Sequence, residues 1–267
     1  MESQHLIYAL ALTLFAGLAT GIGSLIALVA HRTNKTLLAF SLGLSAGVMI
    51  YVSFVELFAH AQESLIESYG EQMGVLYAVV AFFVGVGFIA LIDFLVPSAE
   101  NPHEARVVED IEKPQSAKRL KRMGLLTAAA IAIHNFPEGI ATFATAYQDP
   151  SLGLAIAIAV AIHNIPEGIA VSVPIFYATG SRKKAFWYSL LSGVAEPLGG
   201  ILAYVVLMPL ISDSLMAAVL AFVAGIMVYI SVDELLPAAR EYGREHVSIV
   251  GFIVGMAVMA ASLILLI

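Results

Sequence analysis

The chain has 267 residues, of which 60% are hydrophobic and only 12% are charged, and its mean hydropathy is +0.91. A soluble globular domain carries about twice this fraction of charged residues, so the composition excludes an ordinary soluble protein and indicates a protein of the lipid bilayer. The sequence contains no cysteine, which excludes disulfides, thiolate metal sites and thiol nucleophiles. The net charge of −7 becomes informative only once the charges are placed on the two sides of a membrane.

Eight apolar runs follow one another, each close to the roughly 20 residues that a helix needs to span a bilayer. We predict spans at residues 6–30, 36–60, 73–96, 123–147, 152–177, 185–208, 215–238 and 247–267. The first run is too long for a signal peptide and Glu2 stands where a basic segment belongs, so we expect it to stay in the protein. The predicted fold is an all-α membrane protein, a single transporter domain over residues 1–267 with a polar loop at 97–122.

Basic residues occur only in alternate connections between these runs. The connections after the first, third, fifth and seventh runs contain all 13 Lys and Arg residues, while the other connections and both ends contain none. Because basic residues accumulate on the cytoplasmic side, we predict that these four connections, including the 97–122 loop, are cytoplasmic and that both termini lie outside. Orientation explains the basic connections, so they require no nucleic acid.

One stretch occurs twice, in the fourth and fifth runs. Residues 131–141 read IAIHNFPEGIA and residues 160–170 read VAIHNIPEGIA, identical at nine of eleven positions. The polar residues are His134, Asn135 and Glu138 in the first copy and His163, Asn164 and Glu167 in the second. On a helix, the His and Glu of each copy share one face and the Asn lies about 100° round from the His. Ionisable residues inside an apolar span are costly unless they are used, so we interpret the two copies as the functional site.

A second internal match relates the second and seventh runs. AGVMIYVSFVEL at residues 46–57 and AGIMVYISVDEL at residues 224–235 are identical at seven of twelve positions. The charge argument makes the members of each matched pair cross the membrane in opposite directions. This predicts an inverted repeat, 3+2+3, in which spans 1–3 are related to spans 6–8 and span 4 to span 5. Chance similarity between helices rich in small residues is the alternative, and it has more weight for the second match than for the first.

The doubled motif predicts a metal site near the bilayer midplane, where inverted-repeat transporters hold their substrates. Imidazole, carboxylate and amide oxygen suit borderline divalent ions such as Zn²⁺, Fe²⁺, Mn²⁺ and Co²⁺, and the lack of thiolates disfavours Cu⁺. The two glutamates could bridge two ions about 3.5–4 Å apart. Pro137 and Pro166 each remove a helical hydrogen bond, so we expect loosened or unwound backbone beside the two histidines.

Two further acidic residues lie within other runs. Glu196, followed by Pro197 near the middle of the sixth run, is the natural candidate to complete the site. The alternative is a packed, protonated glutamate. Asp93, near the inner end of the third run, is interpreted as structural.

Two pairs of polar residues lie near opposite ends of their runs. Glu56 and His60 are near the outer end of the second run, and Asp233 and Glu234 are near the inner end of the seventh. They could receive ions on the entrance and exit sides. Alternatively, acidic residues near helix ends simply reach interfacial water.

The segments HNFPEGIATF, HNIPEGIAVSVPIFYATGSRKKA and SGVAEPLGG resemble the ZIP metal transporters, and the resemblance covers essentially the whole chain. It implies a binuclear metal site on spans four, five and six. His134, Glu138, His163 and Glu167 match the first metal position; Asn135, Asn164 and Glu196 match the second; Glu138 and Glu167 bridge them. Asp233 and Glu234 align with a family exit site that often has His first.

The resemblance also implies broad import of divalent metals, among them Zn, Fe, Mn, Co and Cd, as substrates without a prosthetic group. It further implies a bacterial inner membrane, a homodimer, and movement of spans one, four, five and six against the rest. Many relatives carry a His-rich loop after span three, whereas the loop here contains only His103.

Two other functions could use the same residues. An intramembrane metalloenzyme would need an open metal position and a separate general base, as HExxH supplies. Here the order of His and Glu differs, and the motif is doubled symmetrically. A proton-coupled antiporter would use His and Glu as a relay and should keep transporting its main cation without metal. We therefore expect a secondary transporter that imports divalent metal ions, and not an enzyme.

Overall fold

The structure is a computed structural model that describes residues 2–29, 35–95, 117–207, 212–241 and 245–266. These residues form helices and no strand. The α-helices are α1 (Glu2–Val29), α2 (Lys35–Val52), α3 (Ala59–Tyr69), α4 (Glu71–Leu95), α5 (Ala117–Gln148), α6 (Pro150–Thr179), α7 (Arg182–Gly193), α8 (Ala195–Leu202), α10 (Asp213–Ile230), α11 (Leu236–Glu241) and α12 (Glu245–Leu266). Three short π-helices interrupt or extend them: η1 (Ser53–Phe58), η4 (Ala203–Leu207) and η5 (Ser231–Leu235).

Seven helical stretches of the described chain are long and apolar enough to cross a membrane, as expected of a helical, multi-pass membrane protein. They correspond to all the predicted runs except the fourth. The fourth run forms α5, several of whose side chains lie outside the described residues. α5 contacts α1, α6, α7 and α8, and residues 139–146 are all buried. Nearer its start, Leu125 and Ile133 are exposed.

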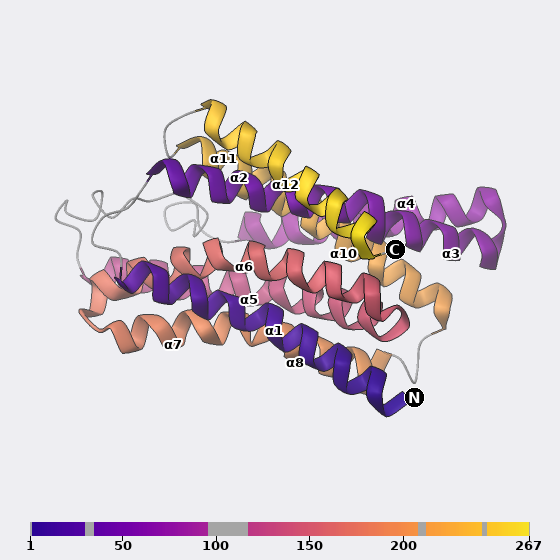
Figure 1. Ribbon diagram of the computed structural model, residues 1–267, viewed down its shortest axis with the longest axis horizontal. Coiled ribbons are helices and arrows are strands. Elements are labelled where there is room, and N and C mark those ends of the chain that lie inside the picture. Colours follow the sequence, from indigo (N-terminus) through magenta and orange to yellow (C-terminus); the bar gives the residue numbers. More distant parts are fainter. Residues whose placement is uncertain (1, 30–34, 96–116, 208–211, 242–244, 267) are drawn as a thin grey trace.

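The helices form two groups (Figure 1). α1, α5, α6, α7 and α8 contact one another, and so do α2, α3, α4, α10, α11 and α12. Across the boundary, α6 contacts α2 and α12, and α5 contacts α10. α1 begins and α12 ends at the same end of the bundle, and α5 turns into α6 at that end too (Figure 1).

Glycines allow the closest helix contacts within each group. A methyl group added at Gly47 of α2 would overlap the carbonyl oxygen of Phe252 in α12. One added at Gly225 of α10 would overlap the carbonyl oxygen of Phe82 in α4. Small residues at such crossings let helix backbones approach closely, which is the usual basis of helix packing in membranes.

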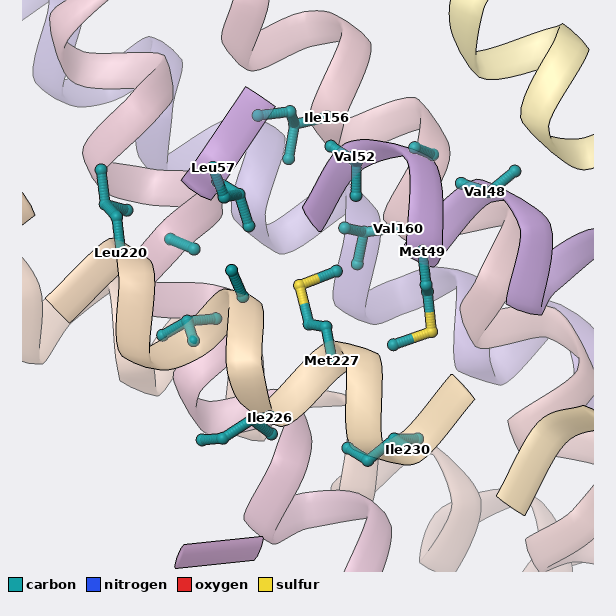
Figure 2. Packing of buried hydrophobic residues seen from close by; sticks show 14 of the residues in the cluster. Val48, Met49, Val52, Leu57, Ile156, Val160, Leu220, Ile226, Met227 and Ile230 are labelled. Carbon is teal, nitrogen blue, oxygen red and sulfur yellow. The ribbon is translucent and has the colours of Figure 1, made fainter. Parts of the chain in front are cut away.

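An apolar cluster fills the boundary between the two groups (Figure 2). It contains Val48, Met49 and Val52 from α2, Leu57 from η1, Ile156 and Val160 from α6, and Leu220, Ile226, Met227 and Ile230 from α10. Ile156 and Val160 precede His163 along α6. The cluster therefore lies between the doubled motif and the end of the bundle where α5 turns into α6.

The prediction of unwound backbone at the motif prolines is wrong. α5 and α6 continue as α-helices through Pro137 and Pro166. A proline removes one hydrogen bond, and closely packed neighbouring helices hold the rest of the helix in place. The interruption falls instead in the sixth run, at Val194 between α7 and α8, three residues before Pro197.

The predicted 97–122 loop is shorter than expected at its C-terminal side. Residues 117–122 read AKRLKR, consist of good helix formers, and belong to α5. Residues 97–116 lie outside the described residues.

Candidate metal site

His163 on α6 lies between glutamates from both copies of the motif. Its Nε2 is 2.8 Å from Oε1 of Glu167, one turn further along α6, and 3.7 Å from Oε1 of Glu138 on α5. All three side chains are buried, and the most exposed, Glu167, is 5% exposed. His and Glu share a face of α6, so this imidazole reaches the carboxylate of its own copy and, across the helix contact, that of the other.

Asn164, the next residue along α6, faces α1 and α8. Its Nδ2 donates a hydrogen bond to the carbonyl oxygen of Ala16, at 2.9 Å, and another to Oε1 of Glu196. Both amide hydrogens are thereby used, which leaves Asn164 Oδ1 as an acceptor. Asn164 Oδ1 and Glu196 Oε2 are buried, and no group in the described part of the chain donates a hydrogen bond to them. A buried polar atom left unpaired costs about 1–3 kcal/mol, so two such oxygens together favour a cation as their partner.

The first copy of the motif is described in part. Asn135 is buried, and its Nδ2 donates a long hydrogen bond of 3.5 Å to the carbonyl oxygen of Ser192. His134 belongs to α5 by its backbone, but its side chain lies outside the described residues. Among the side chains that are described, no three from His, Asp or Glu converge closely enough to hold an ion by themselves. The structure thus brings the site residues together in pairs and not as a closed cage.

The glycine that ends each PEG sequence positions the helices around the site. A methyl group added at Gly139 would overlap the carbonyl oxygen of Glu196, and one added at Gly168 would overlap that of Thr20. Gly139 thus lets α8 approach α5 beside Glu138. Gly168 in the same way lets α1 approach α6 beside Glu167.

Polar residues also gather where α5 turns into α6. Glu56 in η1 is half-buried and His60 in α3 is exposed. Asp149 caps α6 by accepting hydrogen bonds from the backbone N–H groups of Ser151, at 2.9 Å, and Leu152, at 3.1 Å. The pKa of Asp149 is lowered by its hydrogen bond from the Ser151 hydroxyl, then by the backbone N–H groups, and also by the nearby His60. Sequence reasoning missed Asp149 here, although an Asp-Pro pair is a usual helix start.

The opposite end of α10 carries the other predicted pair. Glu234 is buried and Asp233 is exposed, and both belong to η5. Glu56 and Glu234, which align in the second internal match, therefore both lie in π-helical turns. Near them, the Tyr229 hydroxyl donates to Asp93 Oδ2 at 3.5 Å, so Asp93 links α4 to α10.

Comparison with known proteins gives one family and many close relatives. The family described as "ZIP Zinc transporter" matches residues 95–263. The chain is 60% identical over 266 residues to a protein named "Zinc transporter ZupT" from Oceanobacillus iheyensis, covering 98% of this chain and 99% of that protein. It is 58% identical over 265 residues to a protein of the same name from Streptococcus mutans, covering 99% and 100%. A third such protein, from Nitratidesulfovibrio vulgaris, is 57% identical over 274 residues, covering 99% of each chain.

Proposed function

The chain belongs to the ZIP family of zinc transporters, and on this premise we propose that it imports divalent metal ions, zinc first among them, through the buried site between α5, α6 and α8. The relatives are named as transporters, so the metalloenzyme alternative is set aside and the protein is not an enzyme. The proposed localisation is a bacterial inner membrane, and the proposed partners are the cargo ions, the bilayer and a second copy of the chain.

The observation that carries the proposal is the meeting of His163 Nε2 with Glu138 and Glu167 inside the bundle. One imidazole and two carboxylates are a ligand set that suits zinc and its divalent neighbours. A dipositive ion also offsets the cost of burying two carboxylates far from water. We assign the first ion to these residues together with His134.

A second ion position is assigned to Asn135, Asn164 and Glu196. Its support is the pair of unpartnered buried oxygens, Asn164 Oδ1 and Glu196 Oε2. The hydrogen bonds to Ala16 and Glu196 fix which way the Asn164 amide points, so its oxygen is already placed for a cation. Glu138 and Glu167 are then the bridging ligands between the two positions.

We further propose that α5 is an eighth span. α1 begins and α12 ends at the same end of the bundle, which favours an even number of crossings (Figure 1). Seven apolar stretches alone would leave the termini on opposite sides. Together with the alternating basic connections, this supports both termini outside.

The glycine contacts support the 3+2+3 inverted repeat. Two close contacts between α1 and α6 have counterparts between α8 and α5. The contact of Gly168 with Thr20 corresponds to that of Gly139 with Glu196. The contact of Gly23 with Ile165 corresponds to that of Gly199 with Phe136. Thr20 and Gly23 in α1 are each 176 residues before Glu196 and Gly199 in α8, which is one constant register. Gly47 and Gly225, which align in the second match, make equivalent contacts with Phe252 and Phe82. The π-helices η1 and η5 begin at aligned serines, Ser53 and Ser231.

Import requires the two helix groups to move relative to each other. An ion arriving at the α5–α6 turn meets the apolar cluster of Figure 2 before it reaches His163. We therefore propose that α6 and its group shift against α2 and α10, opening the site to one side and then the other. The residues Glu56 and His60 lie at the entrance, and Asp233 and Glu234 at the exit.

Uptake by the purified protein in proteoliposomes tests this proposal. We expect saturable zinc uptake, with competition from other divalent ions, when membrane potential and pH gradient are varied separately. Protein-free vesicles give the background. Transport of a monovalent cation in a metal-free medium, without zinc uptake, would replace the importer with the antiporter.

A further inference from the structure

Ser45 makes a hydrogen bond with the metal-site histidine from the other helix group. Ser45 Oγ on α2 lies 2.5 Å from His163 Nδ1 on α6. Both side chains are 0% exposed.

The orientation of the His163 ring determines which ring nitrogen faces the proposed metal ion. Nε2 points toward Glu138 and Glu167, whereas Nδ1 points away, toward Ser45. A neutral imidazole that binds a metal through Nε2 must carry its proton on Nδ1. That N–H needs an acceptor in a buried setting, and the Ser45 hydroxyl oxygen is an acceptor at the right distance.

A serine hydroxyl also suits the ring before the ion arrives. When Nε2 carries the proton toward Glu167, Nδ1 becomes an acceptor, and the same hydroxyl can donate to it. The Ser45–His163 bond therefore persists in either tautomer, and no buried nitrogen is left unpaired. An alanine at position 45 would leave Nδ1 without this partner.

Ser45 also has no equivalent serine in the internal repeat. In the register of the second match, position 45 of α2 corresponds to position 223 of α10, which is a buried valine. Valine has no hydrogen-bonding side chain. The ligands repeat between the two copies of the motif, whereas Ser45 does not repeat between α2 and α10.

We propose that Ser45 is a positioning residue for metal transport, which orients His163 so that Nε2 is presented to the cargo ion, and that it does so from the helix group opposite the site. This inference rests on the proposed function of the site. Ser45 itself does not bind the ion. Because α2 and α6 belong to different groups, the bond exists only while these two helices stay in the described arrangement.

The test compares Ser45→Ala with Ser45→Thr, which keeps the hydroxyl, and with Thr13→Val as a matched control. Thr13 is also 0% exposed, but its hydroxyl donates to Ala9 of its own helix, at 2.8 Å. Initial uptake of Zn²⁺ and Mn²⁺ is measured against ion concentration in proteoliposomes. Loss of a residue that orients a metal ligand typically lowers metal affinity about 10–100-fold. We expect Ser45→Ala to raise the KM for zinc at least about tenfold with little change in maximal rate, and manganese, which prefers oxygen ligands, to respond less.

A double-mutant cycle shows whether Ser45 acts through His163. Equilibrium zinc binding is measured for Ser45→Ala, His163→Ala and the double variant. We expect Ser45→Ala to have no further effect once His163 is gone, because the residue has nothing left to orient. If Ser45→Ala does not reach the membrane, Ser45→Cys, which keeps the volume but is a weak acceptor, takes its place beside Ser45→Thr.

Three results would overturn the inference. They are an unchanged zinc KM in Ser45→Ala, equal losses for zinc and manganese, and full additivity with His163→Ala. Each of these, with normal zinc uptake by the wild type, removes the role of Ser45 and leaves the proposed function intact. A wild type without saturable zinc uptake instead removes the proposed function.

Discussion

Replacing Gly168 by alanine tests whether the site depends on the close approach of α1 and α6. The added methyl group would fall inside 3.0 Å of the Thr20 carbonyl oxygen, a distance that real Cβ atoms essentially never show. The obstacle is backbone and cannot swing aside, so the two helices have to separate by roughly 1 Å or more. The 2.9 Å hydrogen bond from Asn164 to Ala16 spans the same two helices and would then lengthen past 3.5 Å.

The expected cost has two parts. Overpacking of a close contact costs about 1–3 kcal/mol, which lowers the unfolding temperature of the protein in detergent. The lost Asn164–Ala16 bond leaves the Asn164 amide held by Glu196 alone, so its oxygen is less firmly placed for the proposed second ion. We therefore expect Gly168→Ala to reduce both thermal stability and zinc uptake per folded protein.

Gly87→Ala is the matched control. Gly87 lies on the exposed side of α4, and an added methyl group there meets no atom within 4 Å. Alanine is the better helix former by about 0.5–1 kcal/mol, so this variant should be at least as stable as wild type and transport normally. Wild-type stability and uptake in Gly168→Ala would refute the packing argument.

Further predictions concern the helix cap Asp149, the buried Glu196 and the orientation in the membrane. Asp149→Ala should lower the stability of α6 by about 1 kcal/mol, measured by thermal unfolding, while Asp149→Asn, also a good cap, should not. The pKa of Asp149 in the folded protein lies below its ordinary 3.8, so the charged cap stabilises the folded protein fully above pH 3.8. This stabilisation is lost as the pH falls through the lower pKa. Equal acid dependence of stability in wild type and Asp149→Asn would contradict this. Glu196→Gln should reduce zinc uptake less than changes at the bridging glutamates, because it touches only the second ion position; an equal loss would place it with them. Cysteines at Glu67 and Asp213 should react with an impermeant thiol reagent outside intact cells, whereas one at Ser181 should not; the reverse pattern would invert the proposed orientation.

The spans were predictable because lipid imposes a simple rule on sequence. Each lipid-facing helix must be apolar over about 20 residues, and seven of the eight predicted runs meet this test in the structure. Several side chains of the fourth run, that of His134 among them, lie outside the described residues, so the structure does not test this run.

Repetition in the sequence points to the residues of the proposed site, but not to their surroundings. His163, Glu138 and Glu167 stand out because the same unusual motif occurs twice in apolar sequence. Ser45 is a single serine in an apolar helix, and only tertiary packing gives it His163 as a partner. The helix break was misplaced because three prolines compete in sequence. The break lies at Val194, before Pro197, whereas α5 and α6 stay helical through Pro137 and Pro166.

The most direct test of the central claim is the zinc uptake rate of Glu138→Gln and Glu167→Gln in proteoliposomes, normalised to folded protein. Attraction between unit charges about 4 Å apart is worth about 4 kcal/mol at an effective dielectric constant near 20, so removing either charge while keeping the shape should reduce uptake of every divalent ion at least about tenfold. Glu71→Gln, an exposed residue at the start of α4, is the charge-matched control and should transport normally. Wild-type rates in both Glu138→Gln and Glu167→Gln would remove the metal from this site.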